Sequence, residues 1–266
     1  MMRSPDGTAF RLDGPRNAPM VVLIHGLGLN HEVWDDTVPD LARLYRVLSY
    51  DILGHGETPA PTGQPSLALL ACQLADLLDH CAVRTAVVVG FSLGGMIARR
   101  FAQDFPDRAS ALAILHSAHR RTPAAQAAIV ARVIQSQAEG PAATVEAALA
   151  RWFTDGFRTA NPAAMSRVRG WVMANDPVTY PLFYRILADG IDEIVAPRPP
   201  IKCPALVMTA DQDHGNGPEM ARAIAAEIAG AQTVILAGLR HMAMMQDPVS
   251  TNAALLAFLS RAVPHG

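Results

Sequence analysis

Short, wholly apolar runs alternate along this chain with longer stretches of helical periodicity, and this rhythm constrains the fold more than any other feature. Runs that are apolar throughout, rather than at every second residue, suit strands of a sheet covered by helices on both faces. The repeated strand–helix–strand order predicts a mostly parallel α/β sheet with right-handed crossovers. The expected strands are Ala9–Leu12, Met20–Ile24, Arg46–Tyr50, Ala86–Val89, Ala111–Leu115, Ala205–Thr209 and Thr233–Leu236.

One long region interrupts this rhythm. Residues 117–200 contain no clear strand and show helical spacing instead, which is more chain than a single crossover needs. We interpret 117–200 as a helical lid over the carboxyl edge of the sheet, and 1–116 with 201–266 as the core. Ordinary crossover helices are the alternative. The expected lid helices are Ala124–Ala138, Val145–Phe153, Ala163–Ala174 and Tyr180–Leu187.

Composition excludes several classes of function. The 266 residues are 50% hydrophobic and carry a net charge of −2 without a basic block, so we expect no nucleic-acid partner. No apolar run approaches the roughly 20 residues that span a bilayer, and the N-terminus lacks an apolar signal segment. We therefore expect a cytoplasmic protein with a small-molecule substrate and no membrane contact, with a homodimer left open. The three cysteines are predicted to be core thiols rather than a disulfide framework.

The segment VVVGFSLGGM (87–96) places a serine between glycines where an apolar strand ends and a helix begins. Small residues two positions before and after it, Gly90 and Gly94, permit a tight turn that holds the Ser92 hydroxyl clear of the backbone. The N–H of Leu93 would then point toward an oxyanion formed on a substrate. The pattern predicts a nucleophilic serine, and a glycine-rich turn with an idle serine is the simpler alternative.

A nucleophilic serine needs a base, an acid that orients the base, and a second oxyanion donor. His241 follows the last expected strand and is the candidate base. Asp213 follows the preceding strand and is the candidate acid, with Asp211 as the alternative. The N–H of Leu27, in the segment VVLIHGLGLN, is the candidate second donor. That segment lacks the third glycine of a dinucleotide loop, so we expect no cofactor. The sequence contains no CxxC and no His-x-x-x-His, so we expect no metal site.

Five segments in this order make the chain resemble the α/β-hydrolase family over nearly its whole length. They are His25-Gly26-Leu27, the loop DILGHG at 51–56, the turn GFSLGG at 90–95, Asp213 and His241. The resemblance implies an α/β-hydrolase fold, with a mostly parallel eight-stranded sheet, flanking helices and a helical lid insertion. It also implies that Ser92, Asp213 and His241 act as a catalytic triad.

A serine nucleophile and the lid segment together narrow the reactions that this chain is expected to catalyse. Residues 150–180 are similar to the lid of 3-oxoadipate enol-lactonases, which implies a small substrate that carries a carboxylate. We predict a serine hydrolase that cleaves a small carboxylic ester or enol-lactone through an acyl-enzyme intermediate. The alternatives are hydrolysis of a C–C bond or cofactor-free perhydrolysis by the same residues, and a non-catalytic ligand receptor.

Three side chains are predicted to contact the substrate. Trp152 belongs to the lid segment, and Met242 adjoins the candidate base. Arg121 is one of several arginines on the expected pocket rim that are able to pair with a carboxylate. The rim arginines are Arg120, Arg121, Arg151, Arg185 and Arg240.

Overall fold

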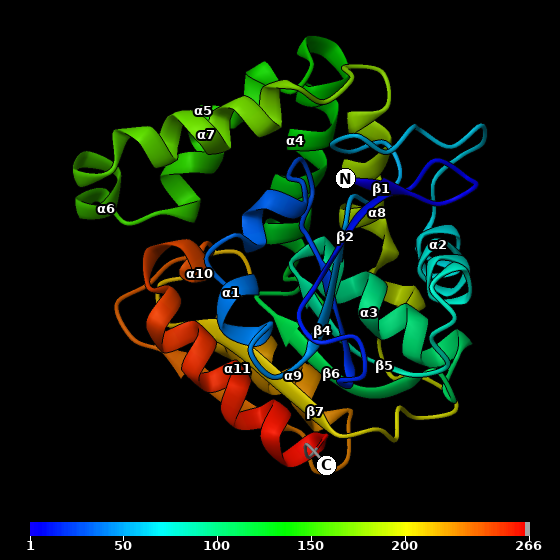
Figure 1. Cartoon of the computed structure of the whole chain (residues 1–266). Coiled ribbons are helices and arrows are strands. Elements are labelled where there is room, and N and C mark those ends of the chain that lie inside the picture. The colour runs from blue at the N-terminus through cyan, green and yellow to red at the C-terminus, as the bar shows by residue number, and fades with distance from the viewer. Residues whose placement is uncertain (264–266) are drawn as a thin grey trace.

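The computed structural model describes residues 1–263 and has a single eight-stranded sheet flanked by helices (Figure 1). The strand order is β1-β2-β4-β3-β5-β6-β7-β8, so the predicted eight-stranded sheet is confirmed. The pairs β1–β2 and β2–β4 are antiparallel and all other neighbouring pairs are parallel. The strands are β1 (Met2–Arg3), β2 (Ala9–Asp13), β3 (Met20–Ile24), β4 (Arg46–Tyr50), β5 (Ala86–Phe91), β6 (Ala109–Leu115), β7 (Ala205–Ala210) and β8 (Gln232–Leu236).

Both faces of the central strands are buried, which explains why their sequences are apolar throughout. In β3, Val22 and Ile24 belong to one hydrophobic cluster, whereas Val21 and Leu23 belong to the cluster on the other face. Successive side chains of a strand point to opposite faces, so each strand feeds two cores. Burial of this kind contributes about 25 cal/mol per Å² of apolar surface.

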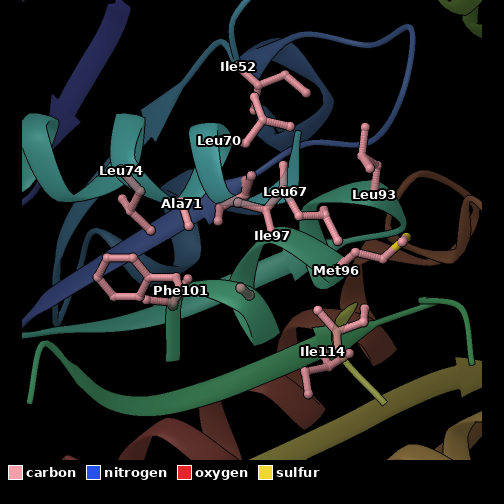
Figure 2. Packing of buried hydrophobic residues seen from close by; sticks show 14 of the residues in the cluster. Ile52, Leu67, Leu70, Ala71, Leu74, Leu93, Met96, Ile97, Phe101 and Ile114 are labelled. Carbon is pink, nitrogen blue, oxygen red and sulfur yellow. The ribbon is translucent and has the colours of Figure 1, made fainter. Parts of the chain in front are cut away.

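Helices cover the two faces. Helices α2 and α3 pack together on one face, where Leu70 and Leu74 of α2 meet Ile97 and Phe101 of α3 (Figure 2). Helices α1 and α11 contribute to the cluster on the other face. The helices outside the lid region are η1 (His31–Trp34), α1 (Val38–Leu41), α2 (Leu67–His80), α3 (Leu93–Asp104), α9 (Pro218–Ala226), α10 (Ala243–Gln246) and α11 (Pro248–Ala262).

Between β6 and β7 the described chain forms helices and their connections but no strand. All four helices expected in this region are present, and the structure adds the short helices α6 and η2. Helices α4 and α8 extend one hydrophobic cluster, and α5 and α7 extend the other. The division into a core and a lid at residues 117 and 200 stays a prediction. The helices here are α4 (Pro123–Glu139), α5 (Ala142–Trp152), α6 (Asp155–Ala160), α7 (Pro162–Met173), α8 (Tyr180–Asp189) and η2 (Gly190–Glu193).

Two details differ from expectation. The two-residue strand β1 was not predicted, because its side chains are exposed and carry no apolar pattern. Cys72 was predicted to be a core thiol, but it is exposed on the outer side of α2, so that prediction is wrong. Within residues 1–263, no helix combines the length and the apolar character that crossing a membrane requires.

A buried arginine joins both ends of the lid region to the core. Arg99 of α3 is 1% exposed and donates to the carbonyl oxygens of Ala118, after β6, and Ile194, after η2. Its guanidinium also pairs with Glu227 at 3.2 Å. The cation therefore satisfies the carbonyl oxygen of Ala118 and shares that of Ile194 with the side-chain amide of Gln103.

Two buried histidines fix the loops that follow β3 and β4. The Nδ1 of His25 lies 2.8 Å from the carbonyl oxygen of Gly26, and its Nε2 accepts the N–H of Ile52 at 3.0 Å. An imidazole that donates at one nitrogen and accepts at the other is neutral. Burial lowers the pKa of His25 to about 4 and that of His55 to about 3. Both rings are therefore neutral components of the loop structure at pH 7.

We expect Arg99→Ala to lower the free energy of unfolding by about 3 kcal/mol or more, because it leaves buried carbonyl groups and Glu227 without their cation. The adjacent Arg100 pairs with Asp104 and Glu193 near the surface. Arg100→Ala is the matched control and should cost about 1 kcal/mol or less. Urea denaturation of both variants measures the difference, and equal losses would contradict the anchoring role of Arg99.

The two histidines predict a pH dependence of stability. Their folded-state pKa values, about 4 for His25 and about 3 for His55, lie below the value near 6.5 of an unfolded chain. The unfolded state therefore binds more protons between these limits, and the unfolding free energy should fall as the pH drops from 6.5 toward 4. Urea denaturation at pH 7, 6 and 5 measures this slope. His55→Phe, which retains a ring against Phe183, should have a shallower slope; an unchanged slope would remove His55 as a cause.

Candidate active site

Ser92 forms the junction between β5 and α3 in a strained backbone conformation, with φ +55° and ψ −113°. Two close approaches hold this turn. A Cβ on Gly90 would lie 2.1 Å from the carbonyl oxygen of Gly94, and a Cβ on Gly94 would lie 2.3 Å from that of Ile24. Only glycine fits at either position, so the glycine spacing predicted from the sequence has a steric cause.

The loop after β3 lies directly beside this turn. A Cβ on Gly26 would come within 3.2 Å of the Cβ of Ser92. No acceptor within residues 1–263 is hydrogen-bonded to the N–H of Leu27, which follows Gly26, or to the N–H of Leu93. Two unused amide donors therefore flank the serine, as an oxyanion site requires.

A carboxylate beyond β7 organises the next part of the site. The Oδ2 of Asp213 accepts a hydrogen bond from the Nδ1 of His241 at 2.7 Å. Its Oδ1 accepts the N–H groups of Gly215 and Asn216 at 3.1 and 3.0 Å. Because Nδ1 of His241 is engaged, its Nε2 is the nitrogen left to act on another group. The alternative acid, Asp211, is exposed and accepts instead the N–H of Gly238 at 2.8 Å.

The Asp213 carboxyl group is held as an anion. Burial alone would raise its pKa, but the charge of His241 and the hydrogen bonds from His116 and His241 outweigh burial and hold the pKa well below its usual value. A carboxylate in this state is able to orient an imidazole and to stabilise a positive charge on it.

Sequence reasoning missed a second histidine on the same carboxylate. The Nδ1 of His116 lies 2.9 Å from the Oδ2 of Asp213, and the ring is fully buried. Burial lowers the pKa of His116, although the hydrogen bond to Asp213 opposes this shift. Its position directly after β6 was the available signal, because the carboxyl ends of neighbouring parallel strands meet at one edge. One ligand atom each from His116, Asp213 and His241 lies within 4.8 Å of the others. Two N–H···O hydrogen bonds account for this cluster, and a metal ion would have to displace both protons.

These groups border one cavity of about 260 Å³. Ser92, Leu27, Asp213 and His241, which follow strands of the sheet, line it together with residues of helices α4, α5 and α8. The Ser92 hydroxyl makes no hydrogen bond to His241 within the described chain. Such contacts are often long in a structure without substrate and tighten when substrate binds.

Of the three predicted substrate contacts, the structure brings two to the cavity. Trp152 lines it, with its ring centroid 6.2 Å from that of His241, and Arg121 lines it as well. The expectation for Met242 is wrong. Its side chain is fully buried in a hydrophobic cluster and does not line the cavity, because its N–H is bonded to the carbonyl oxygen of Trp152 and the chain there turns into α10.

The predicted rim arginines separate into two groups. Arg121 and Arg151 line the cavity, and Arg132 joins them although the sequence reasoning did not select it. Arg120, Arg185 and Arg240 lie outside it. Arg185 pairs with Asp189, and Arg240 donates to the carbonyl oxygens of Ala150 and Phe153 and pairs with Asp155, which ties the loop of His241 to the lid helices.

Comparison with known proteins gives the same fold. The (E)-2-((N-methylformamido)methylene)succinate hydrolase of Acinetobacter baylyi is 27% identical over 256 residues, 96% of this chain and 95% of the relative. The 3-oxoadipate enol-lactonase 2 of the same species is 24% identical over 248 residues, 93% of this chain and 91% of the relative. The crystal structure of the enol-lactonase from Burkholderia xenovorans LB400 matches with a TM-score of 0.87 at 28% identity, over 95% of this chain and 96% of that one. A model of the alpha/beta hydrolase fold matches residues 19–248, and the chain therefore belongs to the α/β-hydrolase family.

Proposed function

We propose that this hydrolase cleaves a small carboxylic ester or enol-lactone through an acyl-enzyme intermediate on Ser92. One observation carries the proposal: the strained serine turn borders the same cavity as His241, whose Nδ1 is bound by the buried Asp213 carboxylate. The chain belongs to the α/β-hydrolase family, and one relative and one similar solved structure are named as enol-lactonases. The cytoplasmic location and the homodimer stay predictions from the sequence.

The first step forms the acyl-enzyme. The Nε2 of His241 takes the proton of Ser92 as the serine oxygen attacks the substrate carbonyl carbon. The carbonyl oxygen becomes an oxyanion and accepts the N–H groups of Leu27 and Leu93. A donor of this type contributes about 3–4 kcal/mol to the transition state in other enzymes. The imidazolium formed on His241 is stabilised by Asp213.

The second step regenerates the enzyme. Collapse of the tetrahedral intermediate breaks the bond to the leaving oxygen, which takes the proton from His241. Water then loses a proton to His241, attacks the acyl carbon and releases the carboxylic acid, while the proton returns to Ser92. Protons balance over the cycle, and the scheme uses only these side chains and water.

The substrate class is supported by the relatives and by the cavity. One relative and one solved structure are named as enol-lactonases, and another relative is named as a hydrolase of a methylenesuccinate derivative. A cavity of about 260 Å³ matches substrates of that size rather than long-chain esters.

We expect Ser92→Ala to lower kcat/KM for p-nitrophenyl acetate by about a thousandfold or more, because the nucleophile is lost and the oxyanion donors remain. A fluorophosphonate should add one label per chain, located at Ser92 by mass spectrometry. Ser260→Ala, on the exposed part of α11, is the control and should keep both properties. Full turnover or undiminished labelling of Ser92→Ala would refute the proposed nucleophile.

His116 should act as a positioning residue through Asp213. The Nδ1–H of His116 withdraws negative charge from the carboxylate that faces His241. We expect His116→Leu to make the carboxylate a stronger partner for the imidazolium, which moves the acidic limb of the kcat/KM profile to higher pH. We also expect kcat to fall by about tenfold with KM within twofold.

His116→Asn is the matched rescue variant. An asparagine amide places an N–H at a similar distance from Cβ, and asparagine tolerates the φ of +49° at this position. The acidic limb should return toward its original pH. If His116→Leu and His116→Asn have the same pH profile as the unaltered chain, His116 has only a packing role.

A further inference from the structure

Three lid helices present one face each to the cavity. The residues that line it recur at intervals of three and four positions, which is the spacing of one side of a helix. On α4 and α5 small lining side chains come before Arg132 and Arg151, whereas α8 contributes two tyrosines and Leu187. The three sets are Ala125, Ala128, Ile129 and Arg132 on α4; Thr144, Ala148, Arg151 and Trp152 on α5; and Tyr180, Tyr184 and Leu187 on α8.

Three of the cavity residues are arginines, and none of them has an acidic partner within residues 1–263. Arg121 donates to the carbonyl oxygens of Leu187 and Ala188, at 3.0 and 3.5 Å. Arg132 donates its Nε–H to the hydroxyl of Tyr184 at 3.0 Å. Arg151 makes neither an ion pair nor a hydrogen bond in this part of the chain.

This contrasts with two of the predicted rim arginines that lie outside the cavity. Arg185 and Arg240 pair with Asp189 and Asp155, as expected for surface cations in a chain with a net charge of −2. A carboxylate able to neutralise the cavity arginines is present only at longer range, in Asp189, which acts on Arg121. The Asp213 carboxylate also lines the cavity, but its oxygens accept hydrogen bonds from His116, His241 and two backbone amides, and none of the three arginines pairs with it.

Half-buried cations beside one another are costly, and the pKa values reflect this cost. Burial, with the like charge of Arg132, lowers the pKa of Arg121 to about 10. Burial and the charge of Arg132 also lower the pKa of Arg151. All three groups still carry a positive charge at pH 7. A bound anion would relieve both the burial and the mutual repulsion.

We propose that Arg121, Arg132 and Arg151 form a subsite for a carboxylate of the substrate. The preferred substrates are then half-esters or enol-lactones of dicarboxylic acids; this inference rests on the proposed function. The reacting carbonyl lies at the sheet wall beside Ser92, and the free carboxylate points to the lid wall. Tyr184 accepts the Nε–H of Arg132, so its own O–H is available to donate to the same carboxylate.

Two matched esters test the inference. Mono-p-nitrophenyl glutarate has a free carboxylate, and methyl p-nitrophenyl glutarate has the same chain with that group methylated. We expect kcat/KM to favour the acid by about tenfold or more. Arg132→Gln and Arg151→Gln should each lower kcat/KM for the acid by about 10- to 100-fold, which is the range for a lost charge-assisted hydrogen bond. Turnover of the neutral ester should stay within about threefold.

Arg120→Gln is the control, because it removes the same charge from an exposed position outside the cavity. It should leave the ratio between the two esters unchanged. Thermal unfolding of each variant checks that the fold is retained. The proposal is overturned if the chain prefers the neutral ester, or if the cavity variants lose activity equally on both esters.

Direct binding separates this proposal from the proposed function. In Ser92→Ala, glutarate should bind in calorimetry in a buffer without chloride, and Arg132→Gln or Arg151→Gln added to that chain should weaken binding by about tenfold or more. If no ester is turned over and Ser92 is not labelled, the proposed function fails. Glutarate binding that the arginine variants weaken would still support the carboxylate subsite. Absence of glutarate binding, or tighter binding of inorganic phosphate than of glutarate, overturns the carboxylate assignment.

Discussion

The contact between the turn at Ser92 and the end of β3 is the constraint on which the rest of the site depends. The strained φ of Ser92 persists because α3 starts immediately after it and packs against the backbone of β3 at Gly94. The same approach brings the loop containing Leu27 beside the serine. One steric arrangement thus exposes the hydroxyl and positions two amide donors around it.

Asp213 has the corresponding role on the other side of the cavity. Its two oxygens accept hydrogen bonds from two imidazoles and two backbone amides, which come from the ends of three neighbouring strands. The carboxylate therefore fixes the relative position of these loops as well as the tautomer of His241. This explains why the group is buried as an anion, since each lone pair has a donor.

The helical region between β6 and β7 is bonded to the same loops. The N–H of Met242 donates to Trp152, and the amide of Asn175 donates to the carbonyl oxygen of Gly28. Arg240 bridges the loop before His241 to α5 and α6. Hydrogen bonds therefore connect α5, α6 and the end of α7 with the loops that carry Leu27 and His241.

The sequence predicted most of the fold, because the strands are buried on both faces and the helices carry clear periodicity. Met20–Ile24 and Arg46–Tyr50 coincide with observed strands. Gly90, Ser92, Asp213 and His241 could be selected because each lies at a strand end, where spacing in the chain converts directly into position at the sheet edge. Contacts between the helices of residues 117–200 and the sheet edge could not be predicted from the sequence, because they depend on how helices distant in sequence pack together. Met242 adjoins His241 in the chain yet points into the core, whereas Arg132 has no local signal and reaches the cavity.

The polarity of the cavity follows from the two parts of the chain that line it, the loops at the sheet edge and the helices between β6 and β7. The sheet edge supplies an uncharged hydroxyl, amide donors and a carboxylate that is bonded to two histidines, whereas the region between β6 and β7 supplies three cations without acidic partners among residues 1–263. Cations that only served solubility would stay in water, where their hydration is undiminished. Held half-buried and close together, they reduce stability, and stability of this kind is commonly given up where binding requires it. The unpaired charge at the lid wall is thus better explained by an anionic substrate than by folding.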